Sequence, residues 1–303
     1  MQRRLVKQGY GTGTMMISLP SKWIKENNLE KGNLINLEFS GNDLVISIKE
    51  SMKKLETTIK INGFSEDIIE NLIKNIYKLG YDRIIVNFSN EQQFKLLQNI
   101  IRTKLIGFEI VKKDSDSCVL ENITEPSEEQ FDNILSKIFL NSDELFEILE
   151  RKMKSEKIAE DFYEFWELIK KYDAFCRRVV AKGKLYDIKS EMLWSFITEF
   201  VNSLKELYYV NEILSKNKNL KISKETLELL REIKELTGKT INIYKEKNID
   251  EIGKIQEIKN NLLKKGHNML ITKRKEEDII VHHLMSCVEN LYQTSEVIYG
   301  LVL

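Results

Sequence analysis

The chain has 303 residues, and its 47 lysines and arginines balance 47 aspartates and glutamates, so the formal net charge is zero. This balance excludes a uniformly basic nucleic-acid-binding protein but allows positive charge to be concentrated locally. The 3 cysteines lie far apart without a CxxC motif, which indicates a reducing compartment. No stretch is apolar enough to span a membrane and no signal peptide opens the chain, so we expect a cytoplasmic protein of two or three domains.

Positive charge is concentrated at the start of the chain. Residues 1–31 hold six basic and two acidic residues, and a short strand pattern is followed by a glycine- and threonine-rich turn over 9–13. An apolar run covers residues 15–19, and Pro20 fits the first position of a short helix over 21–28. This cationic strand and helix could meet a phosphate backbone, and the alternative is a solvated face of lysine and arginine.

A β-hairpin is predicted next, with strands over 34–39 and 44–48 joined by the turn at 40–43. Gly32, between the predicted helix and this hairpin, can adopt a positive φ. About fifty residues cannot bury a sufficient core on their own. Size alone therefore predicts that residues 1–50 pair with a second copy of themselves.

The segments ISLPSKWIKENNLEKGN and LINLEF-SGND-LVISI resemble the SpoVT/AbrB domain. The resemblance covers residues 1 to about 50, and it implies a swapped-hairpin homodimer that binds DNA. On this basis we expect contacts to phosphates or groove edges from Arg3, Arg4, Lys7 and Lys22. We expect further contacts from the turn, through Tyr10, Thr12 and Thr14.

Residues 53–125 predict a small α+β domain of order β-α-β-α-β-β. The expected strands cover 55–61, 84–88, 108–111 and 117–120, and the expected helices cover 66–79 and 91–103. Ser65 is suited to cap the first helix and Gly80 to end it. The segment holds no catalytic constellation, so its role stays open between a spacer or dimer support and a small-ligand sensor.

Residues 126–303 contain no proline after Pro126 and few glycines, which is typical of an all-helical domain. Apolar stripes predict six helices, over 127–154, 157–182, 187–216, 222–247, 249–272 and 275–301. Ser127 is expected to cap the first of them. A weak internal repeat relates the first three helices to the last three, with Glu206 and Glu289 in the middle of each third helix.

Two three-helix units after an AbrB-like domain resemble the PhoU family, and the order of modules resembles archaeal phosphate-uptake regulators. Residues 171–182, KYDAFCRRVVAK, resemble the second helix of that family. The resemblance implies that paired acidic residues four positions apart can bind a divalent or ferric metal ion. Here only one acidic residue of each pair is present, at Asp173, Glu206, Glu257 and Glu289. The alternative for these four residues is an ordinary surface or partly buried acid beside a lysine.

Other motifs carry no prediction of catalysis. The glycines at 9, 11 and 13 lack the lysine and the βαβ frame of a phosphate-binding loop. His282 and His283 are adjacent on a predicted helix and point about 100° apart, so they do not chelate one ion together. The sequence indicates no catalytic Ser/His/Asp or Cys/His set, and we expect a protein that is not an enzyme.

Three functions follow. The first is a homodimeric transcription regulator of phosphate uptake, whose helical domain senses a transporter component, a sensor kinase or phosphate status. The second is an adaptor that dimerises without binding DNA and docks on the ATPase of a phosphate transporter. The third is a metal-dependent function of the helical domain.

Overall fold

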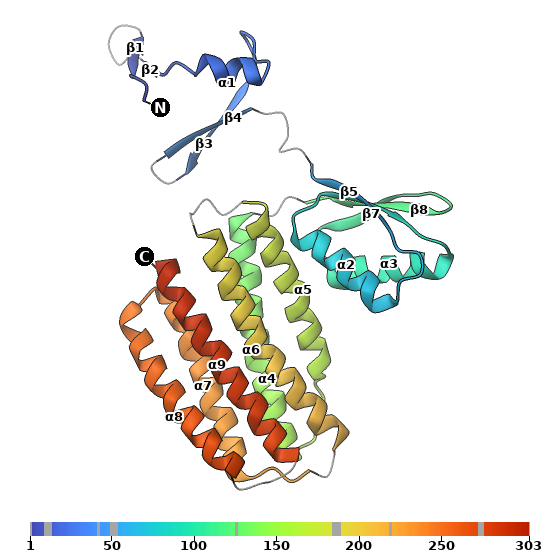
Figure 1. Ribbon diagram of the computed structural model, residues 1–303, viewed down its shortest axis with the longest axis vertical. Coiled ribbons are helices and arrows are strands. Elements are labelled where there is room, and N and C mark those ends of the chain that lie inside the picture. The colour runs from blue at the N-terminus through green and yellow to red at the C-terminus, as the bar shows by residue number, and fades with distance from the viewer. Residues whose placement is uncertain are drawn as a thin grey trace. The chain divides into compact units, whose positions relative to one another are not determined.

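The computed structural model describes residues 2–8, 14–40, 43–48, 54–124, 127–183, 189–217, 220–271 and 276–302. The fold is α+β and mostly helical, with small sheets and a helical C-terminal region, which confirms the predicted class (Figure 1). Contacts divide the chain into a first unit, residues 1–53, and a second unit, residues 54–303. None of the described helices is both long and apolar enough to cross a lipid bilayer.

The first unit contains two short antiparallel strand pairs and one helix. Strand β1 (Val6–Gln8) pairs with β2 (Thr14–Met16), helix α1 spans Ser21–Glu26, and β3 (Ile35–Ser40) pairs with β4 (Asp43–Ile48). The predicted hairpin is therefore confirmed.

Both ends of the helix in the first unit differ slightly from the prediction. Pro20 is the residue before α1 rather than its first residue, although its φ of −64° still suits that position. The helix ends at Glu26, two residues earlier than predicted, because Asn28 has a φ of +50° that no α-helix continues. Gly32 has a φ of +98°, as predicted.

The second unit begins with a four-stranded sheet, which we call the sheet module (residues 54–124). Its strands are β5 (Glu56–Lys60), β6 (Arg83–Asn87), β7 (Phe108–Lys113) and β8 (Ser117–Asn122), in the order β5-β6-β8-β7. Strand β5 is parallel to β6, and the other pairs are antiparallel. Helices α2 (Glu66–Lys78) and α3 (Glu91–Lys104) cover one face of the sheet (Figure 1), so the predicted element order is confirmed.

Helix α2 shows how the apolar pattern selects a buried face. Its buried residues are Ile69, Ile73, Ile76 and Tyr77, which fall at the i, i+4, i+7 and i+8 positions of one helical stripe. Two other apolar residues of the segment predicted as helical are exposed, because Ile68 lies off this stripe and Leu79 follows the last helical turn. Gly80 has a φ of +87° and ends the helix as predicted.

Six long helices form the rest of the second unit, which we call the bundle (residues 127–302). They are α4 (Glu128–Met153), α5 (Phe162–Ala181), α6 (Ser190–Lys216), α7 (Lys224–Glu246), α8 (Ile252–Ile271) and α9 (Glu276–Val302). The six predicted helices are confirmed, except that a 3₁₀ turn over Ile249–Glu251 precedes α8. Ser127 caps α4, since its Oγ accepts a hydrogen bond from the Gln130 backbone while the Gln130 side chain accepts one from the Ser127 backbone.

The bundle packs as two groups of three helices. Helices α4, α5 and α6 contact one another, and so do α7, α8 and α9. The two groups meet mainly along α6 and α9, which share the most extensive helix contact, and also along α4 and α7 (Figure 1). Two of the three pairs of helices that correspond in the predicted repeat therefore pack against each other, α4 with α7 and α6 with α9.

Candidate functional site

The basic residues predicted to contact DNA lie on exposed parts of the first unit. Arg3 and Arg4 precede β1 and Lys7 lies within it, and all three are exposed. The side chain of Lys22, at the start of α1, is 86% exposed, and its Nζ lies 3.8 Å from the carboxylate of Glu26. An exposed ion pair of this length contributes little free energy, so it does not prevent the ammonium from meeting a phosphate.

The register of β1 and β2 separates two of the predicted contacts. Lys7 lies opposite Met15, and Gln8 lies opposite Thr14. Residues opposite each other share a face and successive residues alternate, so Lys7 and Thr14 lie on different faces of this ribbon. The remaining two predicted turn contacts fall outside the described residues, namely Tyr10 and Thr12.

The first unit has no apolar core among its described residues. None of the side chains whose burial is described there is buried. The strand pairs and the residues next to them instead expose large apolar side chains, and the extremes are Leu34 before β3 at 80% and Leu5 before β1 at 64%. The other exposed members are Val6, Met15, Met16, Ile17, Leu37 and Leu44.

The four acidic residues considered as metal ligands lie on four helices, α5, α6, α8 and α9. Asp173 is buried, and each of its two carboxylate oxygens accepts a hydrogen bond from a basic side chain. Its Oδ1 lies 2.6 Å from Nε of Arg177, and its Oδ2 lies 2.9 Å from Nζ of Lys78. A carboxylate neutralised in this way does not suit a metal ion.

Two of the other three acids have a partner of their own, and the third is exposed. Oε2 of Glu206 lies 2.7 Å from Nδ1 of His283, and Oε2 of Glu289 lies 3.6 Å from Nζ of Lys259. Glu257 is exposed on α8. Within the part of the chain that the structure describes, no group of three or more His, Cys, Asp and Glu side chains could hold a metal ion.

A buried electrostatic cluster joins the sheet module to α5, and the sequence did not reveal it. Arg178, whose exposed fraction is 1%, donates to Oδ1 of Asp82 at 2.8 Å and to the carbonyl oxygen of Tyr81 at 2.6 Å. Lys182 donates to the two oxygens of the same carboxylate at 2.7 and 2.8 Å. The available signal was the pair of adjacent arginines, Arg177 and Arg178, within the apolar segment Ala174–Val180 of α5.

Further contacts fix the same junction. Ala174 of α5 is fully buried in the apolar core of the sheet module. Lys104 of α3 pairs with Glu167, and Lys171 donates to the carbonyl oxygen of Arg102 at 3.2 Å. One flank of α5 therefore serves as the docking surface for the sheet module, including part of the segment that resembles a metal-binding helix.

A comparison with protein-family models, characterised proteins and solved structures finds no match to this chain.

Proposed function

We propose that this chain is a homodimeric DNA-binding regulator of transcription. The first unit forms the dimer and carries the DNA contacts, and the bundle is the sensing or interaction domain. The observation that carries the proposal is the first unit itself, in which exposed apolar side chains and exposed basic side chains occur together, and none of the side chains whose burial is described is buried.

The exposed apolar residues favour a dimer. Burial of apolar surface is the dominant favourable term in folding and association, and large exposed apolar patches commonly mark interfaces. Leu34 before β3 and Leu37 within it, together with Val6 of β1 and Met16 of β2, would leave water if two copies exchanged or paired their strands. A second copy of this chain is the partner that the resemblance to SpoVT/AbrB domains implies.

The exposed basic residues favour an anionic polymer as ligand. Arg3, Arg4, Lys7 and Lys22 are exposed, and a dimer would present them twice. Contacts of this kind to phosphates fix the orientation of a protein on DNA and provide much of its affinity. Regulation of phosphate uptake is the process that the resemblance of the bundle to PhoU domains implies.

DNA binding by the full chain, measured against salt concentration, tests the proposal. Each neutralised phosphate contributes about −0.9 to the slope of log K against log salt. Replacing Arg3, Arg4 and Lys7 by alanine in both protomers should therefore reduce the slope by about five and abolish retention near physiological salt. The matched control replaces three exposed lysines of the second unit, Lys60, Lys95 and Lys239, and should bind as the parent does. Equal binding by both triple variants would refute the proposal.

A second candidate function rests on the exact balance of acidic and basic residues. A chain with 47 residues of each sign has no net charge to attract it to DNA at long range, so the first unit could serve dimerisation alone. The protein would then be an adaptor that docks on the ATPase of a phosphate transporter. Recovery of that ATPase together with the chain, and no DNA binding at low salt, would favour this function over the first.

A further inference from the structure

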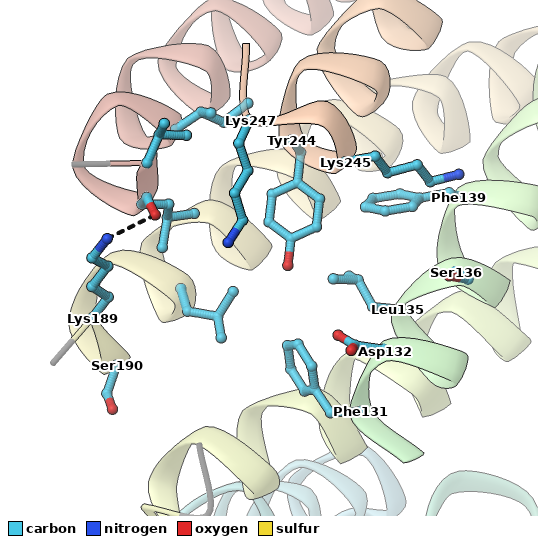
Figure 2. A pocket seen from close by; sticks show the side chains of 14 residues that line it. Phe131, Asp132, Leu135, Ser136, Phe139, Lys189, Ser190, Tyr244, Lys245 and Lys247 are labelled. Atoms are coloured by element: carbon cyan, nitrogen blue, oxygen red, sulfur yellow. Dashed lines mark hydrogen bonds between the residues drawn. The ribbon is translucent and has the colours of Figure 1, made fainter. Parts of the chain in front are cut away.

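One end of the bundle contains a cavity of about 410 Å³. It lies among the first turns of α4, the start of α6, and the last turns of α7 and α9 (Figure 2). This volume is in the range that holds a small organic molecule. The four acidic residues considered as metal ligands are not among the described residues that line this cavity.

The inner wall of the cavity is apolar. Phe131, Leu135 and Phe139 of α4 line it, and each is at most 5% exposed. Leu193 of α6 and Ile298 of α9 complete this wall. Because these side chains are also part of the continuous core of the bundle, they offer an apolar body a preformed surface.

The rim of the cavity is predominantly cationic. Lys189, Lys245 and Lys247 line it, and Asp132 is the one acidic residue among the described residues of its lining. None of the three lysines forms an ion pair with a carboxylate of a described residue. Lys189 donates to the carbonyl oxygen of Leu301 at 2.9 Å, which offsets the negative end of α9 at this cavity.

Lys247 and Tyr244 provide the donors for a ligand. Figure 2 shows the ammonium of Lys247 directed into the cavity beside the ring of Tyr244, whose hydroxyl points toward Leu135 and Asp132. The Tyr244 hydroxyl makes no hydrogen bond to another described residue. Burial raises the pKa of Tyr244, and the charge of Asp132 raises it further, so the phenol stays a neutral donor near pH 7.

We propose that this cavity binds a small organic anion with an apolar body, of the class of a medium-chain carboxylate. The hydrocarbon chain lies against Phe131, Leu135 and Leu193, and the carboxylate lies between Nζ of Lys247 and the hydroxyl of Tyr244. This site is separate from the DNA contacts proposed for the first unit, and its occupancy can be measured without DNA.

Isothermal titration calorimetry of the full chain with decanoate tests the proposal. Decanoate should bind saturably with one site per chain. Both 1-decanol, which lacks the carboxylate, and acetate, which lacks the long hydrocarbon chain, should bind at least about tenfold more weakly. Lys247→Gln should weaken decanoate about tenfold by removing a charge-assisted hydrogen bond. The control Lys239→Gln changes an exposed lysine elsewhere on α7 and should bind as the parent does.

A second variant locates the site independently of charge. Leu193→Trp enlarges a half-buried side chain that lines the cavity, and it should abolish decanoate binding while the helical circular dichroism signal is kept. Absence of saturable decanoate binding to the parent would overturn the proposal. Unchanged decanoate affinity in both Lys247→Gln and Leu193→Trp would also overturn it, and equal affinity for 1-decanol would exclude the anionic class of ligand.

Discussion

The guanidinium of Arg178 lies 2.8 Å from the carboxylate of Asp82, although the two residues are separated by 96 positions in the sequence. Both side chains are almost entirely buried, at 1% and 3% exposed. Arg178 also lies over the rings of Tyr77 and Phe108, with centroid distances of 5.1 and 5.0 Å. This contact holds the sheet module against the bundle. It also explains why the charged side chain of Arg178 is buried, which the helical periodicity of the sequence does not predict.

Replacement of Asp82 by alanine should destabilise the second unit by about 3–5 kcal/mol, because it leaves Arg178 and Lys182 buried without their counter-charge. Urea unfolding followed by circular dichroism measures the effect. The matched control is Glu56→Ala, which removes a partner of Arg83 from a pair whose side chains are 40% and 45% exposed. That change should cost less than about 1 kcal/mol, and similar costs for the two variants would contradict the role given to Asp82.

Asp173 should act as an ion-pair partner rather than as a metal ligand. Asp173→Asn should lower the unfolding free energy by about 2–3 kcal/mol, since Lys78 and Arg177 both lose a counter-charge. Elemental analysis of the dialysed parent protein should find no stoichiometric divalent or ferric ion at this position. Metal that is retained by the parent and lost in Asp173→Asn would show that the prediction is wrong.

The turn before β7 should tolerate only glycine. Gly107 has a φ of +76°, and a Cβ there would collide with Oγ1 of Thr124. Gly63 has a similar φ of +77°, but nothing lies within 4 Å of its added Cβ. Gly63→Ala therefore isolates the backbone cost of roughly 1–2 kcal/mol.

Gly107→Ala should cost at least about 1 kcal/mol more than Gly63→Ala, because a steric cost is added to the same backbone cost. Thermal unfolding of the two variants provides the comparison. An equal loss of stability in both would mean that Thr124 moves aside freely.

Acid should weaken the contact between α4 and α7. Hydrogen bonds from Arg231 at 2.8 and 3.0 Å, and then the ammonium of Lys154, hold the pKa of Glu150 below its ordinary value of 4.5. A carboxylate whose pKa is lower in the folded state stabilises the chain above its unfolded-state pKa. This contribution is then lost as the pH falls through the folded-state pKa.

Glu150→Gln should therefore flatten the loss of stability between about pH 5 and pH 3, relative to the parent. Urea midpoints measured across this pH range test the expectation. Glu246→Gln, at an exposed position near the end of α7, is the control and should follow the parent. If the urea midpoints of Glu150→Gln and the parent fell equally with pH, the ion pair of Glu150 with Arg231 would not be a source of acid sensitivity.

A charge within the exposed apolar surface of the first unit should prevent dimer formation. Leu37 is 57% exposed in β3, and Leu37→Asp should yield a monomer because a dimer would bury an unpaired carboxylate. Asn33→Asp adds the same charge in the same unit without removing an apolar side chain, and should leave the dimer intact. Native mass spectrometry distinguishes the two. A parent that is itself monomeric, or a dimeric Leu37→Asp variant, would contradict the proposed assembly.

The candidate DNA-binding residues were predictable in part. The sequence identifies Arg3, Lys7 and Lys22 as exposed cations, because charged side chains in a short segment with few apolar residues remain in water. It does not show that Lys7 and Thr14 lie on different faces of the β1–β2 ribbon. That separation depends on strand register, and a shift of one residue would reverse it.

The sequence by itself determined the element order of the second unit, from β5 to α9, because apolar periodicity and caps such as Ser127 act within a few residues of the chain. The tertiary structure decided the neighbours: the order β5-β6-β8-β7, the contact of α6 with α9, and the docking of the sheet module on α5. Arg178 illustrates the reason. A buried cation is stable only beside a counter-charge, and Asp82 reaches it through folding rather than through sequence spacing.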